Sequence, residues 1–187
     1  MGDKKFPGGR EILDAYGLLI RQLGICSGAK VADLGCGTTG YFAFQAAQEI
    51  GETGIVYAVD ILKLILRNIE NRAKMLGLNN IKTIWSNLED YGATEVHDGS
   101  VDYAFLISVL FQNKKPETIL RESARIMRRG GRLLVVDWKR GRFPFGPPAE
   151  MKIAQEKVRE LALGAGLKEI KEISAGKFHY GIIFEKL

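Results

Sequence analysis

Two aspartates and the glycine-rich turn between them are the residues of this chain most able to do chemistry. Asp33 lies near the end of an apolar run and is followed by the sequence GCGTTG at residues 35–40. Glycines let the backbone turn sharply and lie against a ligand, and the helix that follows aims its free N–H groups there. Asp60 ends the next apolar run, about twenty residues later, where a carboxylate can accept both hydroxyls of a ribose. The pattern indicates a nucleotide-binding strand, turn and helix.

The glycine spacing leaves two kinds of ligand open. Residues 35–40 also satisfy GxGxxG, the pattern of dinucleotide-binding proteins, so a nicotinamide cofactor is an alternative. Asp33 favours a different ligand. A carboxylate at the end of the first strand would repel a pyrophosphate but attract the ammonium of an amino-acid tail.

The motif Asp33-x-Gly35-x-Gly37 followed by Asp60 resembles the cofactor site of class I S-adenosylmethionine-dependent methyltransferases. The order of the later elements resembles the small-molecule branch that includes the ubiquinone and menaquinone biosynthesis methyltransferases. The likeness runs from about residue 24 to residue 187, and it departs at Thr39, one position before the chain places its third glycine. It implies S-adenosylmethionine as cofactor and S-adenosylhomocysteine as product.

The resemblance assigns ten positions to the cofactor. Asp33 would pair with the ammonium of the amino-acid tail, Asp60 would accept the ribose hydroxyls, and Ile61 would form an apolar wall for the adenine. Ser108 would lie near the methionine part. The ten positions are Asp33, Gly35, Cys36, Gly37, Thr38, Asp60, Ile61, Asn87, Leu88 and Ser108.

The adenine contact is where the chain departs again from the family. Asn87 stands where relatives commonly carry an acid, and its side-chain carbonyl can still accept a hydrogen bond from the adenine amino group while the Leu88 N–H donates to the ring. Glu89 or Asp90 is an alternative for this contact. Asn87 is also a common turn residue without any ligand.

The sequence gives less evidence about the residues that would contact the methyl acceptor. Related enzymes often place a histidine near Phe111, and its absence removes an obvious general base. Asp137, which ends a strand at the ligand edge, is the first candidate for a catalytic role, followed by His179 and Tyr180, with Lys139 as a further polar neighbour. A lone histidine on a late strand is more often structural.

The segment at residues 139–148, KRGRFPFGPP, is expected to be a loop. One hypothesis is that it closes over the acceptor, with Phe143 and Phe145 as an apolar lining. Its basic residues, Lys139, Arg140 and Arg142, could instead grip a phosphate, or the loop could simply be solvated.

Composition limits the other classes of function. The length of 187 residues fits one domain, assigned to residues 1–187 with a loose tail at 1–9. Cys26 and Cys36 lie in no metal-ligand pattern, so no metal is expected. The net charge of +5 permits RNA as a partner, although a solvated, mildly basic surface is favoured. The polar start and the lack of a bilayer-length apolar run predict a cytoplasmic protein with no membrane span.

Strands and helices alternate along the chain, which predicts an α/β Rossmann-like sandwich of three layers. The sheet is expected to be seven-stranded and mostly parallel, closed by an antiparallel C-terminal hairpin because the turn at residues 175–177 is short. Helices are expected at 10–23, 41–50, 61–76, 116–129 and 149–165. Strands are expected at about 31–34, 54–60, 80–85, 101–107, 132–137, 167–174 and 178–185.

These observations favour methyl transfer to a small, partly apolar acceptor by in-line displacement. Alternatives are a methyltransferase for RNA or protein, and a non-catalytic protein that keeps the cofactor pocket. The identity of the acceptor and the oligomeric state stay open, because acceptor specificity lies in loops and fold does not fix function.

Overall fold

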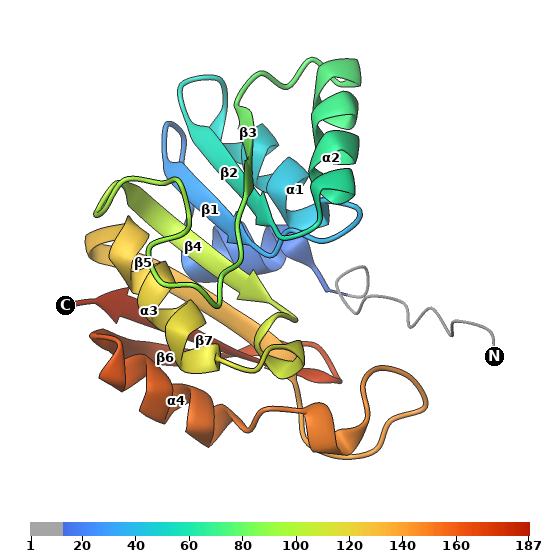
Figure 1. Ribbon diagram of the computed structural model, residues 1–187, viewed down its shortest axis with the longest axis vertical. Coiled ribbons are helices and arrows are strands. Elements are labelled where there is room, and N and C mark those ends of the chain that lie inside the picture. The colour runs from blue at the N-terminus through green and yellow to red at the C-terminus, as the bar shows by residue number, and fades with distance from the viewer. Residues whose placement is uncertain (1–12) are drawn as a thin grey trace.

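The computed structural model describes residues 13–187, so the predicted tail at 1–9 and the start of the predicted first helix lie outside the described residues. Seven strands form one sheet in the order β3-β2-β1-β4-β5-β7-β6 (Figure 1). Strands β1 to β5 run parallel, and β7 is antiparallel to both β5 and β6, which confirms the predicted sheet. The strands are β1 (Lys30–Leu34), β2 (Ile55–Asp60), β3 (Ile81–Trp85), β4 (Val101–Ile107), β5 (Met127–Trp138), β6 (Leu167–Ala175) and β7 (His179–Lys186).

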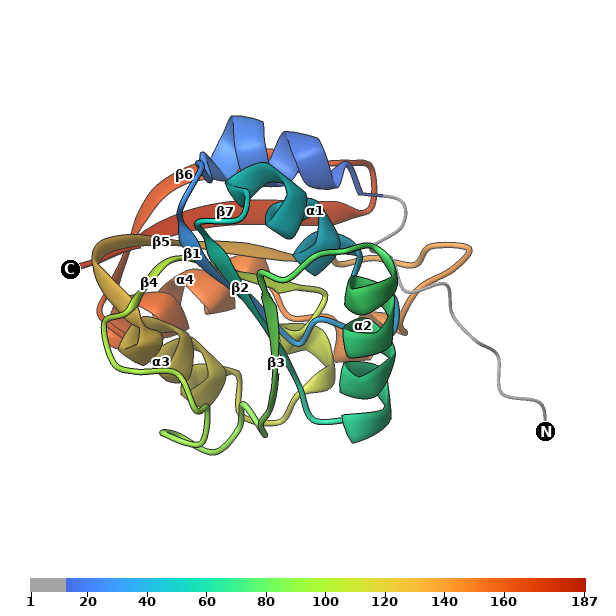
Figure 2. The same ribbon diagram turned by 90° about the horizontal axis from the view of Figure 1, so that it is seen from above.

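Helices cover both faces of the sheet. Side chains from η1, α1 and α2 share one buried cluster with one face, and side chains from α3 and α4 share a second cluster with the other. Figure 2 shows η1 and α1 on one side of the sheet and α3 and α4 on the other. The helices are η1 (Gly17–Leu23), α1 (Tyr41–Ile50), α2 (Lys63–Met75), η2 (Leu110–Gln112), α3 (Pro116–Ile126), η3 (Ala149–Met151) and α4 (Gln155–Gly164).

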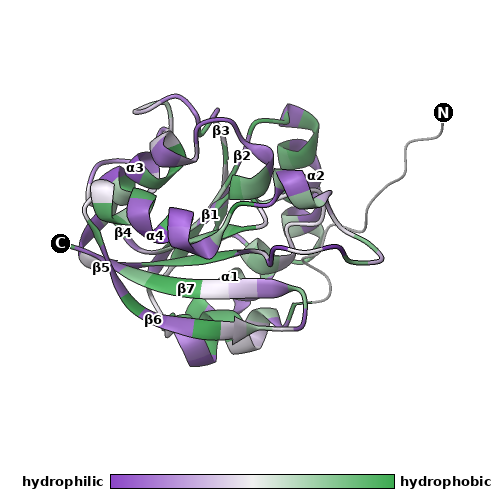
Figure 3. Cartoon of the chain, turned by 90° about the horizontal axis from the view of Figure 1, so that it is seen from below, coloured by the Kyte–Doolittle hydropathy of each residue, from purple (hydrophilic) through white to green (hydrophobic). Residues whose placement is uncertain are grey.

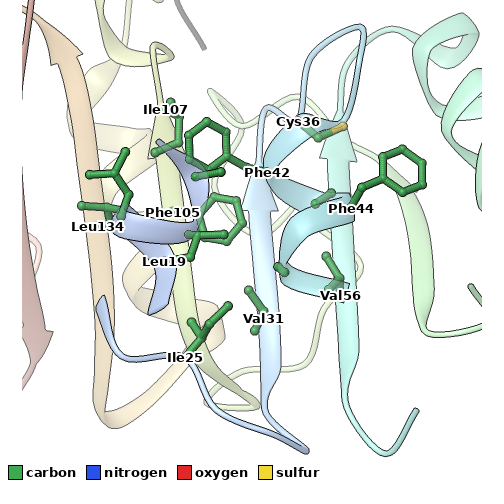
Figure 4. Close-up of a cluster of buried hydrophobic side chains, with 14 of the residues drawn as sticks. Leu19, Ile25, Val31, Cys36, Phe42, Phe44, Val56, Phe105, Ile107 and Leu134 are labelled. Atoms are coloured by element: carbon green, nitrogen blue, oxygen red, sulfur yellow. The ribbon is translucent and has the colours of Figure 1, made fainter. Parts of the chain in front are cut away.

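The core follows from the apolar strands. Hydrophobic residues gather on the strands, while the outer surface of α4 is largely hydrophilic (Figure 3). Burial of the strands from both sides removes their apolar surface from water, which is the main favourable term in folding. In the close-up of the first cluster, Phe42 of α1 faces Phe105 of β4, with a centroid distance of 6.0 Å (Figure 4).

The junction of α3 and β5 differs from the prediction. The helix ends at Ile126, and β5 begins at Met127, which pairs with Val101 of β4 before the register shifts. The glycines at 130–131 allow this irregularity, because a Cβ on Gly131 would lie 2.8 Å from the Arg128 carbonyl oxygen. Residues 127–131, expected from the sequence at the end of the helix and before the strand, therefore belong to β5 and contain its irregularity.

The helix predicted at 149–165 is interrupted in the structure. A short η3 is followed by an extended segment, and α4 begins only at Gln155. The interruption coincides with two bonds to neighbouring elements: Lys152 Nζ donates to the Gly141 carbonyl at 2.7 Å, and the Ile153 carbonyl accepts from the Tyr180 hydroxyl at 3.3 Å. Tertiary contacts have overridden the local helical pattern here.

Within the first predicted helix, residues 17–23 form the π-helix η1, which ends at Gly24 in a left-handed conformation, as the sequence predicted for its end. No helix within residues 13–187 is long and apolar enough to cross a membrane. The carboxyl ends of the parallel strands lie at one edge of the sheet, where doubly wound folds bind ligands.

Candidate functional site

A cavity of about 470 Å³ opens at the carboxyl ends of β1, β2, β3 and β4. Its volume lies in the range of small-molecule sites. The glycine turn after β1, the end of β2 and the segments after β3 and β4 supply its walls. The lining residues are Gly35, Gly37, Thr38, Thr39, Asp60, Ile61, Leu62, Ile65, Ser86, Asn87, Leu88, Ser108, Val109, Phe111, Gln112 and Asn113.

The glycine turn is fixed to its neighbouring strand by backbone hydrogen bonds. The N–H groups of Gly35 and Cys36 donate to the Val59 carbonyl at 2.8 and 2.9 Å. Gly35 has a φ of 80°, and a Cβ there would lie 2.9 Å from Val109 Cγ2. This position therefore needs glycine both for its left-handed backbone and for the close approach of the segment after β4.

Asp60 is the one carboxylate among the described lining residues, and its orientation is fixed. Its Oδ2 atom accepts from the Gly37 N–H at 3.1 Å, and its Oδ1 atom accepts from the Leu62 N–H at 3.0 Å. Each carboxylate oxygen keeps a further lone pair for a ligand hydroxyl. Asp60 thus ties the glycine turn to the start of α2 while it presents its charge to the cavity.

Asp33 and Asp60 lie on the same face of the sheet. Asp33 pairs with Ala58 across the β1–β2 ladder, and Ala58 and Asp60 are two residues apart on β2, so all three side chains point to the same side. Asp33 is fully buried, however, and does not line the cavity. Cys36 is also fully buried and outside the lining. Direct cofactor contacts by these two residues stay predictions.

The segment after β3 forms a tight polar turn. Asn87 lines the cavity, but its Oδ1 atom accepts from the Glu89 N–H at 3.1 Å and its Nδ2 atom donates to Asp90 at 2.8 Å. Glu89 accepts from the backbone N–H of Lys115 at 2.7 Å, which links this turn to the start of α3. The carboxylates of Glu89 and Asp90 therefore have local partners, and neither residue lines the cavity.

The segment after β4 bends sharply into the cavity at Ser108. With a φ of 54°, Ser108 is the only non-glycine residue among the described ones that has a left-handed backbone. Its hydroxyl is buried and has no hydrogen-bond partner within residues 13–187. A strained residue with an unsatisfied hydroxyl at a cavity wall is typical of a functional site.

Asp137, His179 and Tyr180, the three catalytic candidates from the sequence, do not line this cavity. The Asp137 carboxylate is fully buried and accepts from the backbone N–H groups of Phe111 and Trp138, at 3.1 and 2.8 Å. Through the Phe111 N–H, Asp137 is bonded to the segment after β4. In this structure Asp137 holds that segment, and a direct contact between Asp137 and the acceptor stays a prediction.

The Tyr180 and His179 side chains are both buried and make packing or hydrogen-bond contacts within the fold. The Tyr180 hydroxyl donates to the Ile153 carbonyl, and burial together with the Asp137 carboxylate raises its pKa well above the ordinary value. His179 is buried against the Trp138 ring, with ring centroids 4.2 Å apart. Burial, and then the positive charges of Lys139 and Lys152, lower the pKa of His179 to about 4.

The loop at 139–148 packs against Phe178, the residue before β7, and against Trp138 of β5. Phe143 and Phe145 lie against Phe178, at centroid distances of 5.3 and 4.6 Å, and Phe145 also contacts Trp138. Lys152 Nζ lies 4.1 Å from the centre of the Phe143 ring. Neither phenylalanine lines the cavity in this structure. The aromatic side chains pack against Phe178 and Trp138 here, and closure of the loop over an acceptor stays a prediction.

The sequence located most of this site and missed part of it. Eight of the ten predicted cofactor positions line the cavity: Gly35, Gly37, Thr38, Asp60, Ile61, Asn87, Leu88 and Ser108. Four further lining residues stand directly beside predicted ones, so adjacency to the motifs was the available indication for Thr39, Leu62, Ser86 and Val109. No such indication was available for Ile65, Gln112 and Asn113, which also line the cavity. Within residues 13–187, no three His, Cys, Asp or Glu side chains lie together as a metal site would require.

Comparisons with known proteins agree with this geometry. Residues 25–185 match a family described as a methyltransferase domain. The chain is 29% identical over 126 residues to the arsenite methyltransferase of Aquipseudomonas alcaligenes, a match that covers 65% of this chain and 36% of that protein. It is 29% identical over 113 residues to the demethylmenaquinone methyltransferase of Geobacillus stearothermophilus, covering 60% and 47%. The chain spans about half or less of the length of these relatives.

Among solved structures, the chain resembles a SAM-dependent methyltransferase from Aquifex aeolicus. The TM-score is 0.86 at 25% sequence identity, and the match covers 97% of this chain and 94% of that one. The [4+2]-cyclase SpnF has the same fold, with a TM-score of 0.76 at 14% identity over 90% of this chain and 79% of that chain.

Proposed function

Because the chain belongs to the methyltransferase domain family, as the match over residues 25–185 shows, we propose that it binds S-adenosylmethionine and methylates a small molecule. The observation that carries the proposal is the position of Asp60. Its carboxylate lies in the cavity wall, at the end of the strand beside the glycine turn, and hydrogen bonds from two backbone N–H groups hold its orientation.

The residues present fit this cofactor. Asp60 would accept the ribose hydroxyls, and the adjacent Ile61 and Leu62 would offer apolar contact to the adenine. The buried, unpartnered hydroxyl of Ser108 is a donor for the polar methionine part. Asp33, on the same face of the sheet as Asp60, would act on the amino-acid tail.

When bound, the cofactor supplies a methyl group that is activated by a positively charged sulfur. The chain then has to align an acceptor and keep water away. Val109 and Phe111 bring apolar surface to the cavity wall, and Asp137 holds the Phe111 backbone in place. Alignment of this kind can supply several kcal/mol without a strong general base. Small-molecule acceptors are favoured because the relatives' names refer to arsenite and demethylmenaquinone.

Two measurements test the proposal. Titration calorimetry with S-adenosylhomocysteine should show binding at one site per chain. Incubation of the protein with cell extract and cofactor carrying a radiolabelled methyl group should transfer label to the small-molecule fraction. Label that appears only in RNA or in protein would contradict a small-molecule acceptor. Binding of the cofactor product without transfer to any fraction would favour a non-catalytic protein.

A further inference from the structure

Two carboxamide side chains stand next to each other on the segment after β4, and both line the cavity. Gln112 is the last residue of η2, and Asn113 follows it directly. Each donates its amide NH₂ back to a carbonyl four residues earlier. Gln112 Nε2 donates to the Ser108 carbonyl at 3.2 Å, and Asn113 Nδ2 donates to the Val109 carbonyl at 2.7 Å.

These hydrogen bonds settle the orientation of both amides. A backbone carbonyl can only accept, so the amide nitrogen and not the amide oxygen must face it. Each side-chain carbonyl oxygen therefore points away from the backbone carbonyl to which its own NH₂ is bound. The two side-chain carbonyl oxygens therefore remain available at this wall of the cavity as hydrogen-bond acceptors.

The segment that carries these amides is rigidly held. Ser108 fixes its start through a left-handed backbone and a 2.7 Å hydrogen bond from its N–H to the Val136 carbonyl. Asp137 fixes its middle through the Phe111 N–H. A site whose supporting groups are already ordered loses less conformational entropy when a ligand binds.

We propose that Gln112, with Asn113 beside it, selects methyl acceptors that carry a hydrogen-bond donor. The inference rests on the proposed function, since it assigns these residues to the acceptor side of the same cavity. The Gln112 Oε1 atom accepts a hydrogen bond from a hydroxyl or an amine of the methyl acceptor. The neighbouring Phe111 packs against the apolar part of the same molecule. A hydrophobic pocket alone discriminates poorly between such molecules, whereas a placed polar group discriminates strongly.

The test uses three small aromatic probes that differ in their donors. These are 4-fluorophenol, 4-fluoroaniline and 4-fluoroanisole, added to the protein saturated with S-adenosylhomocysteine and followed by fluorine NMR. Molecules of this size bind with dissociation constants on the order of millimolar, so titration to about 10 mM is sufficient. We expect the phenol or the aniline to bind and the anisole, which lacks a donor, to bind at least about fivefold more weakly. Comparison of the phenol and aniline affinities shows whether the site prefers an O–H or an N–H donor.

Gln112→Met removes the amide while it keeps the length of the side chain, and Lys114→Met is the matched control at an exposed neighbour outside the lining. Gln112→Met should abolish the preference over the anisole, and Lys114→Met should keep it. Equal binding of all three probes to the unmodified protein, no binding of any, or an unchanged preference in Gln112→Met would each overturn the inference. Calorimetry with S-adenosylhomocysteine on the same samples distinguishes failure of this inference from failure of the proposed function. If the unmodified protein binds S-adenosylhomocysteine, the proposed function stands whatever the probes show. If it does not bind, both the proposed function and this inference are overturned.

Discussion

The Gly37 N–H donates a hydrogen bond of 3.1 Å to Asp60 Oδ2, which joins the glycine turn after β1 to the last residue of β2. The same carboxylate accepts from the Leu62 N–H at the start of α2. One side chain therefore organises two walls of the cavity before any ligand arrives. In the proposed function the same carboxylate would also accept from a ligand hydroxyl.

Asp60→Asn should weaken the binding of S-adenosylhomocysteine by about 30-fold, which corresponds to about 2 kcal/mol. The amide keeps the shape of the side chain, but its NH₂ group faces a backbone N–H and cannot accept from it. Titration calorimetry of the two proteins measures the change. Glu95→Gln, at an exposed carboxylate without a role in the cavity, is the control and should bind as the unmodified protein does. Affinity of Asp60→Asn within twofold of the original would contradict the proposed ribose contact.

Ser108→Gly should be more stable than Ser108→Ala by about 1 kcal/mol. Both substitutions remove the buried, unpartnered hydroxyl, but only glycine adopts a φ of 54° without a steric penalty, which outweighs its extra freedom in the unfolded chain. Urea denaturation without ligand measures the difference. Both variants should also bind S-adenosylhomocysteine more weakly if the hydroxyl contacts the cofactor. An alanine variant as stable as the glycine variant would show that the backbone at this position carries no strain.

The sequence was sufficient for the architecture because its indications were local and redundant. Alternating apolar runs and amphipathic helices, punctuated by glycines, predicted every strand of the sheet and the C-terminal hairpin. Asp33 and Asp60 could be placed on one face from strand parity once their strands were known to be neighbours. The motif also implied most of the cavity, since its wall is built from residues beside the turn.

The remaining features depended on contacts between distant segments. The helix expected at 149–165 is broken because Lys152 and Ile153 bond to Gly141 and Tyr180, which no local pattern reveals. Asp137 had the position expected of an acceptor neighbour, at the carboxyl end of a central strand. Its depth and its bond to the Phe111 N–H became visible only when β4 and β5 were placed side by side.

Glu122→Gln should destabilise the fold by about 3 kcal/mol at pH 7, the free energy that corresponds to the lowered pKa of Glu122. Burial alone would raise the pKa of Glu122, but hydrogen bonds from Arg125 and from the Gly92 and Thr94 backbone outweigh it and lower the pKa to about 2. Because this value lies below the ordinary 4.5, the stabilisation is complete above pH 4.5 and is lost as pH falls toward 2. Urea denaturation at pH 7 and at pH 3 should show the two proteins converging.

The comparison variant for Glu122 is Asp98→Asn, which removes the other carboxylate paired with Arg125. The Asp98 side chain is 78% exposed, whereas Glu122 is fully buried. Exposed ion pairs contribute less than about 1 kcal/mol, so this variant should lose much less stability. Equal losses in the two variants would show that the charge on Arg125, and not the burial of Glu122, determines the effect.

His179 should make the fold less stable as the solution becomes mildly acidic. Burial against Trp138, and then the charges of Lys139 and Lys152, lower its pKa to about 4 from the ordinary 6.5. Between these two values the unfolded chain binds a proton that the folded protein excludes, so stability falls as pH decreases from 6.5 to about 4. His179→Phe keeps an aromatic ring beside Trp138 and cannot be protonated. Urea denaturation at pH 7, 5.5 and 4 should show the stability of the unmodified protein falling by about 2–3 kcal/mol more than that of the variant. Parallel curves for the two proteins would mean that His179 is as easily protonated in the fold as in the unfolded chain.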